Sequence, residues 1–351
     1  MKNMNTEICS KIGDYLIGCE LEDEGLLHGS AGMSIFFYNL AKETSDMKYK
    51  KHADSLIDKV FGKKTQLTDF KSGLAGIGWC IEYLIQNGFC SGNADEILED
   101  ADNRIFFLLS GQNEIPFNLY DGYIGYLQFI MMRLKNEKSS KLVKMVNIEM
   151  FKYLVNTIDL ISPYSILNML KDIKFDLMSN NYVLIKSLLD AMSLNLYNDK
   201  IINMFSQWRS FLTSSIPALH FNRVYMSILL FKMNRFLHLE AIDRHIRTLL
   251  FSIEKNTLMT EIDLRELYNV RFGFLGSLLI LREGIELLDS SYPNYELLLM
   301  INTEISVFCD KRLIETINGL NNNKVQKKEV TFGLAEGWAG TGMLLLKTMQ
   351  I

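Results

Sequence analysis

A glycine-rich phrase that recurs along the chain constrains its fold more than any other feature. It reads H-G-S-A-G at residues 28–32, S-G-L-A-G-I-G at 72–78 and G-W-A-G-T-G at 337–342. Each copy runs directly into an apolar stretch of helical length. Because a phrase repeated at long intervals is typical of folds built from similar units, we expect a repeat architecture.

The intervals between the copies predict how many units the chain holds. The G-x-x-G cores begin at Gly29, Gly73, Gly122, Gly273 and Gly337. The interval from the third core to the fourth spans about three ordinary intervals, so two units within it have lost their glycines. We place the apolar helices of these two units at residues 182–196 and 217–236.

Charged amphipathic stretches alternate with the apolar helices. A helix that is apolar on most sides is buried, whereas a helix with one apolar stripe lies outside it. The sequence therefore predicts an all-α fold with two layers and about fourteen helices in seven pairs. No alternating β-branched runs between hairpin dipeptides indicate strands. The outer helices are expected at residues 49–61, 94–109, 142–160, 200–212, 241–253 and 295–317.

Glycines in the first turn of a helix need a reason, because each costs roughly 1 kcal/mol relative to alanine. One reason is a turn that needs φ > 0, and a second is the crowding of converging inner helices. A third is functional, since bare helix N-termini offer N–H groups to anionic or polar ligands. We favour the two architectural reasons over the third.

Composition excludes several classes of protein. The 351 residues carry a formal net charge of −4, which argues against a nucleic-acid or anionic-membrane surface. No signal peptide and no apolar run long enough to span a membrane are visible, and five cysteines form no C-x-x-C pair. We expect a cytoplasmic protein with reduced thiols and a single domain over residues 1–351, in which the polar stretch 318–328 is a mobile surface loop.

The glycine phrases resemble those of the lanthionine synthetase C-like family, the cyclases of lanthipeptide biosynthesis. The likeness extends through the spacing over nearly the whole chain. It implies an α,α-toroid (α/α barrel) of about seven inner and seven outer helices around a central cavity. In active family members two cysteines and a histidine bind zinc there. The zinc lowers the pKa of a peptide cysteine, whose thiolate adds to a dehydroamino acid and closes a thioether ring.

The chain departs from this family at the positions that would bind zinc. The family's W-C-Y-G phrase aligns near residues 219–222 (L-H-F-N), where His220 is the only candidate ligand. The family's C-H-G phrase aligns with R-F-G at 271–273, so Arg271 stands where a thiolate is expected. An arginine cannot ligate a metal, and its charge opposes one. We therefore expect no zinc or other cofactor, although active relatives bind zinc.

Six residues are candidates for a functional site on this resemblance. His28, Arg271 and His220 are the candidate catalytic residues, and we assign no metal ligands. Asn118, which replaces a family aspartate, is a candidate for the cavity rim, as are Asp121 and Glu336. These two carboxylates are also the acid/base pair of a more distant hypothesis, a carbohydrate-active helical barrel.

Each candidate also has a structural interpretation. Histidines at glycine turns commonly cap or pack, and Arg271 would form a salt bridge to Asp121 or Glu336. Outside this set, His52, His238 and His245 fall in charged outer stretches and are expected to be solvated. Cys80 and Cys309 are expected to be buried core thiols.

The leading hypothesis is a zinc-site-deficient family member, a pseudoenzyme that acts in the maturation of a ribosomally synthesised peptide. It would bind the precursor peptide or a peptide-modifying enzyme. The alternative is a zinc-independent lanthipeptide cyclase that adds cysteine thiols to dehydroamino acids, with the helical-barrel enzyme third. No phosphate loop, H-E-x-x-H or G-x-S-x-G motif indicates other chemistry.

Overall fold

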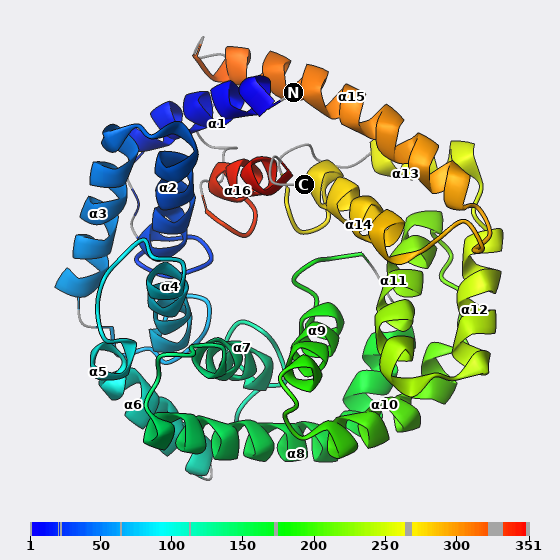
Figure 1. Ribbon diagram of the computed structural model, residues 1–351, viewed down its shortest axis with the longest axis horizontal. Helices are drawn as coiled ribbons and strands as arrows, with labels where there is room; N and C mark the ends of the chain where they lie inside the picture. The colour runs from blue at the N-terminus through cyan, green and yellow to red at the C-terminus, as the bar shows by residue number, and fades with distance from the viewer. Residues whose placement is uncertain are drawn as a thin grey trace. The chain divides into compact units, whose positions relative to one another are not determined.

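The computed structural model describes residues 2–19, 21, 23–63, 65–111, 114–171, 175–263, 269–321 and 333–348. Its backbone contacts separate two compact units. Unit 1 comprises Met1–Asn156 and Ile314–Ile351, and unit 2 comprises Thr157–Leu313. All regular elements of the described residues are helices, sixteen in number (Figure 1).

Unit 1 contains seven complete helices from the N-terminal part of the chain and one from the C-terminal part. It also contains the first half of α8 (Lys141–Lys171) and the last turns of α15 (Tyr295–Asn321). The complete helices are α1 (Lys2–Ile17), α2 (Ser30–Thr44), α3 (Met47–Gly62), α4 (Leu74–Gln86), α5 (Ala94–Ile97), α6 (Glu99–Ser110), α7 (Tyr123–Leu134) and α16 (Trp338–Thr348).

The helices of unit 1 are arranged in two layers. Helices α16, α2, α4 and α7 contact one another in that order, while α3 packs against α2 and α1 packs against α16 and α2 (Figure 1). Ten of the 15 residues of α2 are buried, but α3 buries only a stripe of five. This difference confirms the predicted alternation of apolar inner helices with amphipathic outer ones.

Unit 2 is built around α11, which contacts α9, α10, α12, α13 and α14. Its helices are α9 (Asn180–Ser193), α10 (Asn198–Leu212), α11 (His220–Leu237), α12 (Glu240–Phe251), α13 (Lys255–Asp263) and α14 (Phe274–Leu287), with the adjoining parts of α8 and α15. Helices α9 and α11 confirm the two inner helices expected from units without glycine cores.

Three local expectations differ from the structure. The outer stretch 94–109 divides into α5 and α6, because Leu98 is both the C-cap of α5 and the N-cap of α6. Helix α13 was missed, since nine residues are too few for a clear apolar period. Residues 318–321 of the expected loop belong to α15, and its remainder lies outside the described residues.

The glycines of the first four cores are explained by close approach of the backbone rather than by positive φ. The first glycine of each of these cores is a helix N-cap with extended backbone, with φ of −113° at Gly29, −99° at Gly73, −124° at Gly122 and −83° at Gly273. The expectation of φ > 0 is therefore wrong. At the second glycine, a Cβ would collide with the carbonyl oxygen six residues earlier, at 1.9 Å for Gly32, 2.1 Å for Gly76, 2.3 Å for Gly125 and 2.2 Å for Gly276.

This close approach leaves few helix N–H groups for a ligand. The first three N–H groups of α2 donate to carbonyl oxygens seven residues earlier, at 2.9, 3.2 and 3.4 Å, and those of α4 do the same at 3.0, 3.2 and 3.4 Å. The N–H groups at the start of these two helices therefore already have backbone partners and are not available to a ligand. The glycines of these two phrases are therefore architectural.

The glycine turns of unit 1 are also bonded to one another. We name them the first turn (residues 23–29), the second (67–73), the third (116–122) and the last (333–337). Two N–H groups of the first turn donate to Lys71 O at 3.0 and 3.2 Å, and two of the second donate to Tyr120 O at 2.9 and 3.1 Å. Ala335 N of the last turn donates to Leu27 O at 3.1 Å. The four turns therefore form one continuous backbone-bonded edge.

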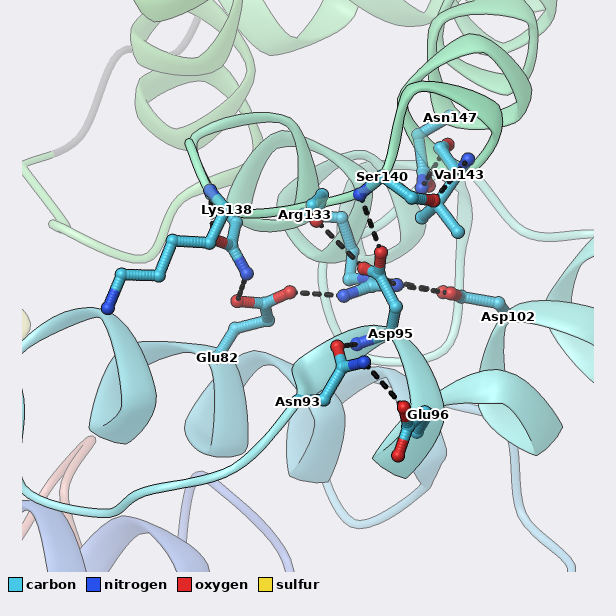
Figure 2. Close-up of polar contacts among 12 residues, drawn as sticks. Glu82, Asn93, Asp95, Glu96, Asp102, Arg133, Lys138, Ser140, Val143 and Asn147 are labelled. Atoms are coloured by element: carbon cyan, nitrogen blue, oxygen red, sulfur yellow. Dashed lines mark hydrogen bonds and ion pairs between the residues drawn. The ribbon is translucent and has the colours of Figure 1, made fainter.

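A buried ion cluster holds the opposite ends of α4 and α7 together with α5 and α6 (Figure 2). Arg133 and Glu82 are fully buried and form an ion pair. Arg133 also donates to Asp102 Oδ2 at 2.6 Å and to Asp95 Oδ1 at 3.2 Å. Burial raises the pKa of Asp102 against the opposing effect of Arg133, whereas hydrogen bonds from Ser140 and others lower the pKa of Asp95 despite its desolvation. We call these four residues the arginine cluster.

Candidate functional site at the glycine turns

The first three turns of unit 1 line an open pocket of about 570 Å³. All of its lining residues except Leu67 lie within the four residues before a glycine N-cap. The lining residues are His28, Leu67, Asp69, Lys71, Ser72, Tyr120 and Asp121. Three of them, His28, Ser72 and Asp121, occupy the same position of the repeat, directly before the N-cap glycine. The repeat therefore brings equivalent side chains together in one pocket.

The backbone around this pocket is fixed by carboxylate and amide side chains. Asp69 Oδ1 accepts the N–H groups of Ser72 at 2.7 Å and Gly73 at 3.2 Å. Asp23 Oδ2 accepts the Ser72 hydroxyl at 2.8 Å. Asn118 Oδ1 accepts the Asp121 N–H at 3.0 Å, so Asn118 shapes the third turn as Asp69 shapes the second. Asn118 is not among the lining residues of the pocket.

Two other candidates of unit 1 differ in their relation to the pocket. His28, a candidate catalytic residue, lines it. Glu336 does not, although the neighbouring Ala335 bonds to the first turn. Asp121 and Glu336 therefore do not line this pocket together, and the carboxylate pair of a helical-barrel enzyme gains no support from it.

Arg271 lies in unit 2, where its side chain forms a two-point ion pair with Asp176. Its Nε donates to Asp176 Oδ1 at 3.1 Å and its Nη2 donates to Oδ2 at 2.5 Å. Both side chains are about one-fifth exposed, at 18% and 19%. The sequence did not indicate this partner, which lies in the segment before α9.

Further hydrogen bonds hold the backbone next to Arg271 and Asp176. Leu177 N donates to Arg271 O at 2.9 Å, and Asn269 Oδ1 accepts the Arg271 N–H at 3.0 Å. Tyr225 donates its hydroxyl to Asp176 O at 3.1 Å. Burial raises the pKa of Tyr225 well above its usual value, so it stays a neutral donor. The segments around residues 176 and 271 are therefore joined by side-chain and backbone bonds together.

His220 is the first residue of α11, and its contacts are structural. Its Nδ1 accepts the Glu254 N–H at 2.9 Å. Its own N–H and that of Phe221 donate to the two oxygens of Glu261 at 3.0 and 2.9 Å, which caps the helix. A histidine nitrogen that accepts a backbone N–H has no lone pair left for a metal at that atom.

The other singled-out side chains also have defined surroundings. His52 is half-buried against the Phe37 ring, and burial lowers its pKa. His245 is half-buried too, with Nε2 at 3.1 Å from Ser215 O, so the expectation of two solvated histidines was wrong. Cys80 is a buried core thiol, as predicted, and burial raises its pKa to about 12. His238 is exposed, as expected, and the side chain of Cys309 lies outside the described part.

These observations bear on the fit of a zinc ion. Arg271 and Phe272, which the sequence resemblance aligns with the family's cysteine and histidine, carry a guanidinium and a phenyl ring, neither of which can ligate zinc. Among the residues that the structure describes, no group of three His, Cys, Asp or Glu side chains could hold a metal. The donor set at these positions does not fit zinc.

Comparison with known proteins identifies the fold. No family model and no curated protein matches the sequence. The solved structure of nisin cyclase matches 99% of this chain and 94% of its own, with a TM-score of 0.63 and 15% sequence identity. A likeness at this identity shows the fold alone. The predicted fold class, an all-α α,α-toroid, is thereby confirmed. No helix in the described ranges has the length and hydropathy to cross a membrane.

Proposed function

We propose that this chain acts in the maturation of a ribosomally synthesised peptide without a catalytic zinc. It binds the precursor peptide, or an enzyme that modifies it, and does not close thioether rings. The fold of nisin cyclase supports the peptide-maturation part of this proposal. In keeping with this role, we place the protein in the cytoplasm as a pseudoenzyme.

One observation carries the second part of the proposal. Arg271 stands at the position of a family thiolate ligand, and Asp176 neutralises its charge in a two-point contact. A side chain held in this way neither coordinates a metal nor approaches a substrate thiol as an unpaired cation. His220, the second candidate in unit 2, is likewise committed to Glu254.

The alternative, a zinc-independent cyclase, would need these residues for proton transfer or electrostatic activation. His28 is the one candidate catalytic residue that lines a described pocket. A single imidazole can move a proton, but the thiol it would activate also needs stabilisation as a thiolate. The contacts of Arg271 and His220 therefore favour the binding role.

A synthetic peptide that carries dehydroalanine and cysteine residues tests this proposal. We expect fluorescence anisotropy to show that the purified chain binds it. We also expect mass spectrometry after thiol alkylation to show that its cysteines stay free, with or without added zinc. Absence of binding would contradict the proposed role, and loss of free thiols would support the cyclase instead. The same peptide with alanine in place of cysteine is the matched control.

A further inference from the structure

The pocket between the first three turns presents one lysine and two carboxylates on a fixed backbone. Lys71 comes from the second turn and Asp121 from the third, and both side chains are exposed. Neither takes part in any of the ion pairs formed by the described residues. The second carboxylate, Asp69, accepts the N–H groups of Ser72 and Gly73 at its Oδ1. Lys71 and Asp121 are therefore the two charges that are available to a ligand.

The backbone beneath these two charges is unusually well bonded. Lys71 accepts two N–H groups at its carbonyl and donates its own N–H to Tyr120 O at 3.1 Å. The Asp121 N–H is held by Asn118 at 3.0 Å. A site whose backbone is already ordered loses little entropy when a ligand binds. Only the side chains of Lys71 and Asp121 have to become ordered when a ligand binds.

The remaining lining indicates what kind of ligand fits between the charges. Leu67, with 56% of its surface exposed, gives an apolar wall, and Tyr120, Ser72 and His28 add polar groups. The volume of about 570 Å³ lies within the range of small-ligand pockets.

We propose that this pocket binds a peptide segment that carries a carboxylate and a cationic side chain a few residues apart. The carboxylate pairs with Lys71 and the ammonium or guanidinium group pairs with Asp121, while an apolar side chain between them lies on Leu67. This inference rests on the proposed peptide-binding function. It specifies the charge pattern of the peptide and the residues that select it.

Reversing charged residues in the protein and in the peptide tests the inference. Three peptides share the dehydroalanine and cysteine residues and differ only in two flanking positions: glutamate then lysine, lysine then glutamate, or glutamine at both. Dissociation constants are measured by anisotropy for the wild type, Lys71→Glu, Asp121→Lys and the double variant. Lys50→Glu and Asp58→Lys, two exposed residues of α3 outside the pocket, are the matched controls.

We expect the wild type to prefer one charged order over the neutral peptide, and each single variant to weaken that preference about two- to fivefold. The double variant, with unchanged net charge, should prefer the opposite order. The preference should shrink in high salt, since the charges are exposed, and the controls should bind as the wild type does. If the wild type binds all three peptides equally and the variants change nothing, this inference is wrong and the proposed function stands. If the wild type binds none, both are wrong.

Discussion

Arg271 and Asp176 contact each other at two points in unit 2, through Nε to Oδ1 at 3.1 Å and Nη2 to Oδ2 at 2.5 Å. They are 95 residues apart in the sequence. The pair joins the segment before α9 to the turn before α14, and a backbone bond from Leu177 to Arg271 lies beside it. A guanidinium–carboxylate fork of this kind fixes geometry as well as charge.

The first prediction is that this pair stabilises unit 2. Arg271→Gln and Asp176→Asn should each lower the free energy of unfolding by about 1.5–3 kcal/mol, because each leaves a partly buried charge without its partner. The double variant should cost less than the sum of the two single variants. Urea unfolding of all four proteins measures this coupling. Strictly additive losses would show that the two side chains do not depend on each other.

The exposed pair Arg244–Glu240 on α12 is the control for this cycle. Its side chains are 70% and 82% exposed, and such pairs contribute little. Arg244→Gln should therefore leave the unfolding midpoint nearly unchanged.

The second prediction concerns the close approach at the glycine turns. In Gly76→Ala the new Cβ would lie 2.1 Å from Phe70 O and 3.0 Å from Leu26 Cβ, so backbone has to move. We expect a loss of about 1–3 kcal/mol or more. Gly62→Ala, at the end of α3 with no atom within 4 Å of the new Cβ, should be neutral or slightly stabilising. Thermal unfolding compares the two, and equal midpoints would contradict the steric explanation.

The third prediction concerns the arginine cluster. Arg133→Met would leave the carboxylates of Glu82, Asp95 and Asp102 together without their cation. Removing one partner of a buried ion pair costs roughly 3–5 kcal/mol, so this variant should unfold at much lower urea concentration or fail to fold. The exposed Arg244→Met is the control. A variant with unchanged stability would mean that the carboxylates take up protons at no cost.

The repeated phrase was sufficient to predict much of the fold. Helices α9 and α11 lie within a few residues of the predicted ranges, because their apolar character persists without the glycines. The reason why glycine is needed at these positions could not be predicted. It depends on the carbonyl oxygen six residues earlier, which the folded turn brings against the start of the helix. The short helices α5 and α13 were missed as separate elements because their 4 and 9 residues are too few for a clear apolar period.

The fourth prediction is a loss of stability on mild acidification. Burial lowers the pKa of His52 and of His245 below the usual 6.5, so both are neutral in the folded chain. As the pH falls through 6.5 the unfolded chain takes up protons first, and stability therefore decreases towards the folded pKa values. His52→Gln combined with His245→Gln should flatten this dependence between pH 7.5 and 5.5, measured by urea unfolding across about two pH units.

The exposed His238 provides the control for this experiment. His238→Asn, which suits its left-handed backbone at φ 52°, should leave the pH dependence unchanged. A double variant as pH-sensitive as the wild type would show that other groups govern the effect.

The candidate site could be predicted only in part. The alignment of R-F-G with a family ligand motif drew attention to Arg271, but its partner Asp176 lies far away in the sequence and carries no motif. Lys71 was missed because a lysine beside a glycine turn has no sequence signature. A comparison of the repeat copies would have drawn attention to this stretch, because Lys71 directly precedes Ser72, which shares its position with His28 and Asp121.

The zinc content of the purified chain tests the central claim most directly. Metal analysis of protein grown with added zinc, before and after chelator treatment, should find no stoichiometric zinc, because Arg271 and Phe272 cannot ligate the ion. The unfolding midpoint should be the same with and without chelator, since the Arg271–Asp176 pair joins its two segments without a metal. One tightly held zinc per chain, with a lower midpoint after its removal, would contradict the account.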